Sequence, residues 1–243
     1  MKSREDAYPF SYNRREVLTF LGLCAASLTP IGLSVRTLAQ ARPTPACIVR
    51  PSQIQGPYFV DERLNRSDIR IDPSTGNISQ GVPLRIAFNV SRVAAGVCAP
   101  LSGAQVDVWH CDAAGVYSDS IDDGVQTRGR KFLRGYQVTD RNGNAVFQTV
   151  YPGWYSGRAV HVHFKIRHGS SSLQTTEFTS QLYFDDALTD AVHDNAPYAA
   201  RGQRDTRNAG DTIYASGGRE LTLTLTKRAP GYTAGFDVGL QTV

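Results

Sequence analysis

The feature that most limits the fold of this chain is a series of short segments in which apolar residues occupy every second position. A period of two is the pattern of a β-strand with one buried face. The segments are residues 84–90, 106–109, 145–150, 160–166, 181–184 and 221–225, with glycines and prolines between them. Residues 187–193 favour one short helix. The sequence therefore predicts an all-β fold, a single β-sandwich domain with long loops and little helix.

The N-terminal segment has the pattern of an export signal. Arg14 and Arg15 precede an apolar run over residues 17–33, and Ala39-Gln40-Ala41 matches the small-residue pattern of a cleavage site. We expect residues 1–41 to be a twin-arginine signal read by the Tat export machinery, and residues 42–243 to be a periplasmic or secreted domain. The alternative is an ordinary N-terminal helix of the domain.

Composition and charge exclude several classes of protein. Hydrophobic residues make up 41% of the chain, which is too large a share for a disordered chain. The net charge is +4 and no long basic block occurs, so nucleic acid is not an expected partner. The apolar run of the signal is short and interrupted by glycine and proline, so we expect no membrane span in the mature protein.

The cysteines do not form a disulfide scaffold or a zinc finger. The chain has 4 cysteines and no Cys-x-x-Cys pair. Removal of the signal would leave Cys47, Cys98 and Cys111, enough for one disulfide and one free thiol. Cys111 is the leading candidate for the disulfide, with Cys47 or Cys98 as its partner, and the sequence leaves the pairing open.

Two histidines share one side of a predicted strand. Residues two apart in a strand point to the same side. Residues 160, 162, 164 and 166 are apolar and face the core, so His161 and His163 face away from it. Two imidazoles on one strand can take adjacent positions on a metal ion, although two surface histidines have the same pattern. A zinc or copper protein is therefore one reading of this motif.

Two tyrosines lie at the ends of glycine-containing turns. Tyr155 ends Pro152-Gly153-Trp154-Tyr155, and Tyr117 follows the predicted strand 106–109. Each has the alternative of being an ordinary core or rim tyrosine. A phenol with a pKa near ~10 is a ligand only for a strong Lewis acid. Ferric iron is such an acid, and it also accepts imidazole nitrogen.

Taken together, these motifs resemble the signature of intradiol ring-cleaving dioxygenases, the non-haem ferric enzymes that include catechol 1,2- and protocatechuate 3,4-dioxygenases. The matching stretches are residues 101–117, 139–143, 152–155, 158–164 and 181–184. All the ligand positions of that family are filled here by tyrosine or histidine. The chain is most similar to the short, exported branch of the family, because nothing like the helical dimerisation region of the large catechol dioxygenases lies between residues 41 and 84.

The resemblance implies a role for each matching residue. Tyr117 and His161 would be equatorial ligands of Fe(III), and Tyr155 and His163 would be axial ligands. Tyr155 would also act as a base toward the substrate.

The resemblance also implies residues that bind and activate the substrate. Arg158 and Gln181 would be catalytic residues that stabilise developing charge. Tyr58, in the stretch Gly56-Pro57-Tyr58, would border the substrate pocket, and Trp154 would bind substrate as well.

The implied activity is insertion of both atoms of O2 into a catechol-type diol, with cleavage between the two hydroxylated carbons to a muconate-type product. The expected partners are a small aromatic diol and O2, and a homodimer is the candidate assembly. The alternative is an exported β-sandwich that binds metal or phenols without turnover. Arg158 and Gln181 argue against this alternative, because a protein that only binds has no need of them.

Other polar residues are expected to have no part in the chemistry. The stretch Arg201-Gly202-Gln203-Arg204 has the composition of a surface charge cluster. His168 and His193 are expected in solvent, and His110 is expected to have a structural role.

Overall fold

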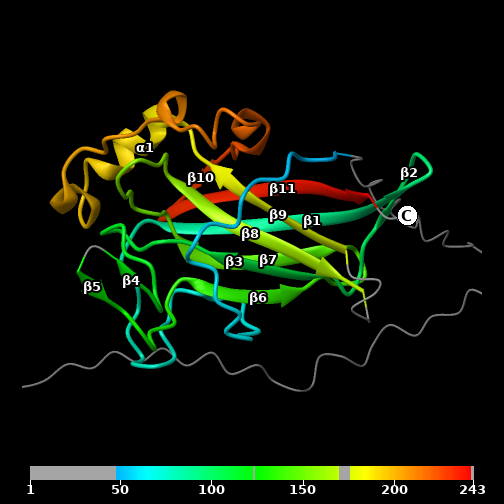
Figure 1. Cartoon of the computed structure of the whole chain (residues 1–243), viewed down its shortest axis with the longest axis horizontal. Helices are drawn as coiled ribbons and strands as arrows, with labels where there is room; N and C mark the ends of the chain where they lie inside the picture. Colours follow the sequence, from blue (N-terminus) through cyan, green and yellow to red (C-terminus); the bar gives the residue numbers. More distant parts are fainter. Residues whose placement is uncertain (1–47, 123, 170–175, 242–243) are drawn as a thin grey trace, which may run out of the picture. The chain divides into compact units, whose positions relative to one another are not determined.

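Two β-sheets pack face to face in the computed structural model, which describes residues 48–122, 124–169 and 176–241 (Figure 1). The first sheet contains the five strands β1 (Pro83–Ala94), β2 (Val97–Pro100), β7 (Asn144–Val150), β10 (Thr226–Arg228) and β11 (Gly231–Gln241). The second has four strands in the order β6 (Arg134–Val138), β3 (Gln105–Trp109), β8 (His161–His168) and β9 (Thr176–Tyr183). The predicted all-β sandwich is confirmed. The predicted export signal lies outside the described residues.

The pairing of the strands places the ends of several of them together. In the second sheet, Trp109 lies opposite His163, and His161 lies opposite Tyr183. All pairs in this sheet are antiparallel, so the end of β3, the start of β8 and the end of β9 meet at one end of it. In the first sheet, β1 pairs in parallel with β11 and antiparallel with β2 and β7.

The core lies between the two sheets and is largely aromatic and aliphatic. Phe88 and Phe236 of the first sheet meet Phe164 of the second, with ring centroids 5.3 and 5.5 Å apart. Val162, Phe164 and Ile166 of β8 are fully buried. Burial of each such side chain stabilises the fold by about 1.5–3 kcal/mol, so the alternating pattern of the sequence is the main determinant of the sandwich.

Most of the predicted strands are present, but residues 221–225 do not form one. Leu221 ends the short helix η3 (Gly218–Leu221), and Thr222 makes a single bridge to Tyr183. Leu221 and Leu223 are nevertheless buried. The segment is therefore extended and packs alternate side chains into the core, which gives the period of two without a ladder of hydrogen bonds.

The last strand, β11, was not expected from the sequence. Ala234, Phe236, Val238 and Leu240 alternate and are buried, as in an ordinary half-buried strand. Three glycines within the strand obscure the pattern, because glycine is uncommon in strand interiors. Long-range pairing with β1 stabilises the strand in spite of its local composition.

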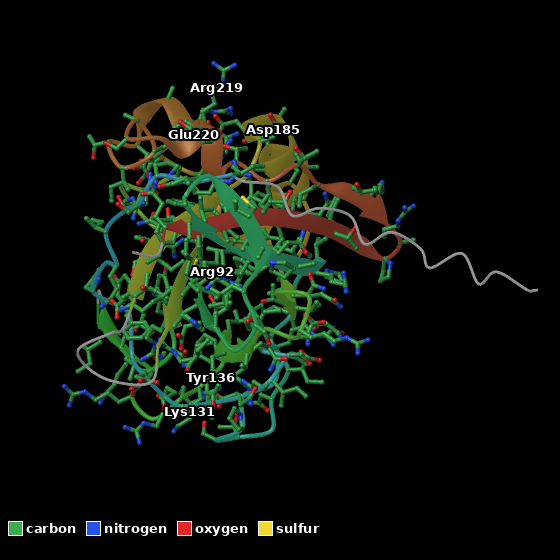
Figure 2. All side chains as sticks on the ribbon, turned by 90° about the vertical axis from the view of Figure 1, so that its right-hand side faces the viewer. Arg92, Lys131, Tyr136, Asp185, Arg219 and Glu220 are labelled. Atoms are coloured by element: carbon green, nitrogen blue, oxygen red, sulfur yellow. The ribbon has the colours of Figure 1, made fainter. Side chains whose placement is uncertain are left out.

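The loops that connect the sheets gather at one end of them. The predicted helix is present as α1 (Asp186–His193), with Asp185 as its N-cap. The short helices η1 (Tyr198–Arg201) and η2 (Asn208–Gly210) follow it, and the hairpin of β4 (Ile121–Asp122) and β5 (Val125–Gln126) lies at the same end (Figure 1). Figure 2 shows Asp185, Arg219 and Glu220 on the side of α1 and the short helices, and Tyr136 and Lys131 on the opposite side. No helix in the described part of the chain is long and apolar enough to cross a membrane.

Two expectations about single residues are wrong. Cys111 is not in a disulfide: its thiol is free and buried, whereas Cys98 is disulfide-bonded. His193 is not solvated, because its imidazole stacks on Tyr198 with the rings 5.0 Å apart and its Nε2 donates to the carbonyl oxygen of Pro152. Cys111 lies two residues beyond the end of β3, and His193 is the last residue of α1.

Candidate metal centre

The two histidines of β8 lie on the face of the sheet that points away from the sandwich core. His161 is 2% exposed and His163 is 1% exposed, so this second face of the strand is buried as well. Their Nε2 atoms are 3.0 Å apart. Trp109 of the adjacent strand stacks on His163, with centroids 5.0 Å apart and rings within 5° of parallel. Cross-strand packing therefore fixes the plane of this imidazole.

The two tyrosines come from loops whose backbones are in direct contact. Gly153 donates its N–H to the carbonyl oxygen of Asp112, and a Cβ at Gly153 would lie 2.5 Å from that oxygen. Gly115 has a φ of 82°, and a Cβ there would lie 2.1 Å from the carbonyl oxygen of Trp154. Only glycine permits such close approach. The glycines beside Tyr117 and Tyr155 thus allow the two loops to bring both phenols to one place.

The four side chains converge. The Oη of Tyr155 lies 3.2 Å from Nε2 of His161. The rings of Tyr117 and Tyr155 are 5.6 Å apart, and those of Tyr117 and His163 are 6.2 Å apart. Among the described residues, no hydrogen-bond partner satisfies the buried Oη of Tyr117. The structure therefore brings together all four side chains that the resemblance implies as metal ligands.

Hydrogen bonding decides which atoms of the histidines are free to bind a cation. Nδ1 of His161 lies 2.6 Å from the carbonyl oxygen of Ala159, which can only accept, so Nδ1 carries the proton. Nε2 of the neutral ring then presents a lone pair toward His163 and Tyr155. Burial, assisted by the charge of Arg158, lowers the pKa of His161 to about 3, and burial lowers the pKa of His163 well below its usual value. Both imidazoles are neutral at physiological pH, as a metal ligand requires.

Burial has the opposite effect on the two phenols. It raises the pKa of Tyr155 to about 12, although the positive charge of Arg158 acts in the other direction. Burial, together with the neighbouring Tyr155, raises the pKa of Tyr117 well above the usual value for tyrosine. Both phenols are therefore protonated unless a strong Lewis acid displaces the proton.

This set of donors fits ferric iron. Two neutral imidazole nitrogens and two phenol oxygens surround one point, and phenolate is a ligand for hard, highly charged cations. The described residues contain no group of three or more His, Cys, Asp or Glu side chains that could hold a metal ion. The donors thus differ from the thiolate and imidazole sets typical of structural zinc.

Arg158 lies beside the metal ligands and is held in place by two partners. Its Nε donates to the buried carboxylate of Asp211 at 2.9 Å, and one of its terminal nitrogens donates to Oε1 of Gln181 at 2.5 Å. The other terminal nitrogen faces Oη of Tyr155 at 3.4 Å. Gln181 also donates to the carbonyl oxygen of Ile54 at 3.0 Å. This network orients one edge of the guanidinium toward Tyr155.

The stretch before the first strand forms one wall of the site. Gly56 lies over His163, where a Cβ would be 3.3 Å from Cε1, and Tyr58 stacks on Tyr117 with the rings 4.1 Å apart. The buried guanidinium of Arg134 donates to the carbonyl oxygen of Tyr58 at 3.1 Å and to Oγ of Ser118 at 2.6 Å. Arg134 thereby joins this wall to the loop of Tyr117.

A cavity of about 400 Å³ opens onto the centre. Its lining includes Tyr58, Tyr117 and Tyr155, and a volume of this size accommodates a small aromatic molecule. Trp154, which was expected to bind substrate, packs against the hydrophobic core, and its Nε1 donates to the carbonyl oxygen of Gly202 at 3.2 Å. Its face supports Arg201, a residue that does line the cavity.

Sequence reasoning missed three residues that shape the site. Asp211 holds Arg158, Trp109 orients His163, and Arg201 lines the cavity. Trp109 lies within a recognised motif, so its position next to a metal ligand could have been inferred from strand pairing. Arg201 ends the short helix η1 and Asp211 directly follows η2, and no pattern in the sequence marks either residue.

Comparison with known proteins places the chain in a family. The model of the family described as Dioxygenase matches residues 54–213. The chain is 31% identical over 172 residues to a catechol 1,2-dioxygenase from Candida albicans, covering 62% of this chain and 51% of that protein. It is 29% identical over 143 residues to a chlorocatechol 1,2-dioxygenase from Pseudomonas putida, covering 51% of each. The chain thus spans about half the length of these curated relatives.

A solved structure matches over a larger share. An intradiol ring-cleavage dioxygenase from Tetranychus urticae superposes with a TM-score of 0.66 at 27% identity, covering 80% of this chain and 94% of that one. The family match includes Tyr117, Tyr155, His161 and His163, the side chains that converge in the structure. The chain therefore belongs to the family of intradiol ring-cleavage dioxygenases.

Proposed function

We propose that this protein is a ferric dioxygenase that cleaves a catechol between its two hydroxylated carbons and adds both atoms of O2, giving a muconate-type product. The observation that carries the proposal is the convergence of two phenols and two neutral imidazoles beside a guanidinium. The names of the relatives, catechol and chlorocatechol 1,2-dioxygenase, support the class of substrate.

Tyr117, Tyr155, His161 and His163 would hold the iron. When bound, ferric iron supplies the Lewis acidity that ionises the catechol hydroxyls and makes the ring reactive toward O2. Aromatic rings cover part of the site, because Tyr58 stacks on Tyr117 and Trp109 stacks on His163. Burial of these groups strengthens the electrostatic interactions among them.

Tyr155 is placed to take a proton from the substrate. It lines the cavity, and burial raises its pKa to about 12, so its ionised form is a strong base. Arg158 lies 3.4 Å from Oη of Tyr155 and stabilises negative charge there. The same guanidinium edge can stabilise charge that develops on a substrate bound next to Tyr155.

Gln181 and Asp211 hold Arg158 ready for this task. The carbonyl oxygen of the Gln181 side chain accepts a hydrogen bond from Arg158, and its amide nitrogen donates one to the carbonyl oxygen of Ile54. Asp211 accepts from Arg158 and from the backbone N–H of Ala159. Because these contacts exist before substrate binds, little reorganisation is needed during the reaction.

The test combines metal analysis, a visible spectrum and turnover. We expect the purified protein to contain iron and to absorb in the visible range through phenolate-to-iron charge transfer. We expect O2 uptake with catechol, 4-substituted catechols or hydroxyquinol, with intradiol products. Tyr155→Phe should weaken the absorption band, whereas Tyr136→Phe, on β6 and not among the converging side chains, should not.

Other results would contradict the proposal in distinct ways. A colourless iron-loaded protein would contradict the ligand assignment, and extradiol products would contradict the reaction. Zinc or copper in place of iron would favour the alternative metal protein. Iron with the expected band but no O2 uptake on any catechol would favour a protein that binds without turnover.

We also propose that residues 1–41 direct export through the Tat machinery, and that the mature protein is periplasmic or secreted. The support is the arginine pair followed by an apolar run and a small-residue cleavage pattern. Replacing Arg14 and Arg15 by lysine keeps the charge but removes the pair that the receptor reads. Cell fractionation should show that the variant stays in the cytoplasm, and unchanged export would contradict the assignment.

A further inference from the structure

The predicted surface charge cluster over residues 201–204 is divided by the structure. The side chain of Arg204 is 4% exposed and forms ion pairs with Asp186 at 2.5 Å and with Asp190 at 2.8 Å. Arg201, by contrast, is exposed as expected, and it lines the cavity that opens onto the candidate metal centre. The two arginines therefore differ in role. Arg204 holds its own loop against α1 through these ion pairs.

Arg201 is held in place by its neighbours. Its guanidinium lies over the ring of Trp154 at 4.7 Å from the centroid, a cation–π contact. Trp154 is fixed in turn by its hydrogen bond to the carbonyl oxygen of Gly202. A Cβ at Gly115 would lie 3.0 Å from Nε of Arg201, so the side chain also lies against the loop that carries Tyr117.

The charge of Arg201 is not neutralised by a salt bridge within the described ranges, where no carboxylate forms an ion pair with it. Asp112 and Asp205 are the carboxylates on which the charge of Arg201 acts. They accept backbone hydrogen bonds instead, from Val116 at 2.9 Å and from Gly157 at 3.1 Å. Arg158, the other cation near the centre, is paired with Asp211.

The other described residues that line the cavity have uncharged side chains. Val116 and Val125 are apolar, Ser120 uses its hydroxyl on the carbonyl oxygen of Tyr117, and Tyr58 offers the face of a ring. Among the described residues that line the cavity, Arg201 is the only one with a charged side chain, so a substituent that reaches into the cavity from a ring near Tyr155 would meet this charge. A guanidinium recognises a carboxylate with strong, charge-assisted hydrogen bonds.

We propose that Arg201 is a specificity residue that selects catechols bearing a carboxylate, with the carboxylate bound to Arg201 and the two hydroxyls at the metal centre. This inference rests on the proposed function, because it assigns the class of substrate to the same site. It does not depend on the chemical step, since discrimination arises when the substituent binds.

The experiment compares an acid with its neutral ester. The probes are 3,4-dihydroxybenzoate and its methyl ester, which share the ring and differ in the charge. For each, kcat/KM is measured by O2 uptake and Kd by calorimetry without O2, using the iron-loaded full chain. We expect the acid to be favoured by about tenfold or more, which is the worth of a hydrogen bond to a charged group. Added salt should reduce the preference.

Variants then assign the preference to the residue. Arg201→Gln should bring the ratio of acid to ester close to one, and Arg201→Lys should keep part of it because the charge remains. The control is Arg219→Gln, which removes the same charge from an exposed site on the outer loops (Figure 2). It should leave the ratio as in the wild type.

The outcomes separate this inference from the proposed function. Equal ratios in the wild type and Arg201→Gln, or a wild-type preference for the ester, would overturn the inference even if catechols are cleaved. If no catechol is consumed, the proposed function fails, and the ratio of the two Kd values still supports or overturns the role of Arg201.

Discussion

The two faces of β8 are about equally hidden from solvent, but they are buried in different ways. On one face, Val162, Phe164 and Ile166 pack into the apolar core of the sandwich. On the other, His161 and His163 are covered by the stretch around Gly56, before the first strand, and by loops from distant parts of the chain. The first face needs only apolar side chains of suitable size, because hydrophobic burial is non-directional.

The polar face depends instead on individually placed groups. Buried carboxylates hold its loops: Asp72 accepts from the N–H of Lys131 at 3.1 Å, and Asp211 accepts from the N–H of Ala159 at 2.8 Å. Asp112 accepts from the N–H of Val116 at 2.9 Å. A buried polar atom without its partner is costly. One strand can therefore carry two kinds of face. One tolerates changes among apolar side chains, and the other requires each polar group to keep its partner.

The largest expected effect on stability lies on the apolar face. Phe164→Ala should lower the free energy of unfolding by about 3–5 kcal/mol, because it removes a buried aromatic ring and leaves a cavity. Urea denaturation measures the loss. Val97→Ala is the matched control: Val97 is 68% exposed, so its loss should stay within about 0.5 kcal/mol. A loss of less than about 1 kcal/mol for Phe164→Ala would show that this face is not a close-packed core.

The polar face should respond in function more than in stability. His161→Ala should reduce iron affinity or kcat/KM at least about 100-fold, since even residues outside the ligand shell are worth 10–100-fold. Metal analysis and O2 uptake measure this effect. His168→Ala removes a histidine from the far end of the same strand and should leave iron content unchanged. Full iron content and activity in His161→Ala would contradict the assignment of this face as the metal site.

Removing the carboxylate that holds Arg158 should have a smaller effect on activity. Asp211→Asn keeps the shape but removes the charge that holds the guanidinium, so kcat/KM should fall about tenfold while iron content stays the same. The split between activity and metal content distinguishes a positioning role from a structural one. Asp237→Asn, which removes a carboxylate from the first sheet, is the control. A parallel loss of iron and activity in Asp211→Asn would show that Asp211 maintains the whole site.

The smallest expected effect is a loss of folding stability in acid, caused by protonation of Asp72. Burial alone would raise the pKa of Asp72, but hydrogen bonds from Ser74, Arg130 and the Lys131 backbone prevail and lower it to about 2. A carboxyl whose pKa falls on folding stabilises the protein above its unfolded pKa near 4. That contribution, about 1–2 kcal/mol, is lost as the pH falls from about 4 to about 2.

Unfolding measured across this pH range tests the role of Asp72. Asp72→Asn should lower stability at neutral pH and flatten the acid limb of the stability curve. An unchanged acid limb would mean that other carboxyls dominate acid unfolding.

The sandwich could be predicted largely from local pattern. Strands 84–90, 145–150 and 160–166 were recognisable because each buries one face, and the side chains alternate accordingly. The strand β11 was not recognisable, because its glycines weaken the pattern and its pairing partner β1 lies far away in the sequence. Residues 221–225 show the reverse error, since alternating burial does not require a paired strand.

By itself, the sequence predicted the sandwich, the family and the side chains proposed to bind iron, because strand periodicity and motif spacing are local properties of the chain. The tertiary structure decided which other residues complete the site. It brought Asp211 to Arg158 and placed Arg201 over Trp154 beside the cavity. These contacts join loops and short helical turns, whose paths depend on packing and hydrogen bonds across long separations and on no repeating pattern. For the same reason, the side chains that would distinguish one catechol from another lie in loops, while those that would bind the metal lie in or next to recognisable motifs.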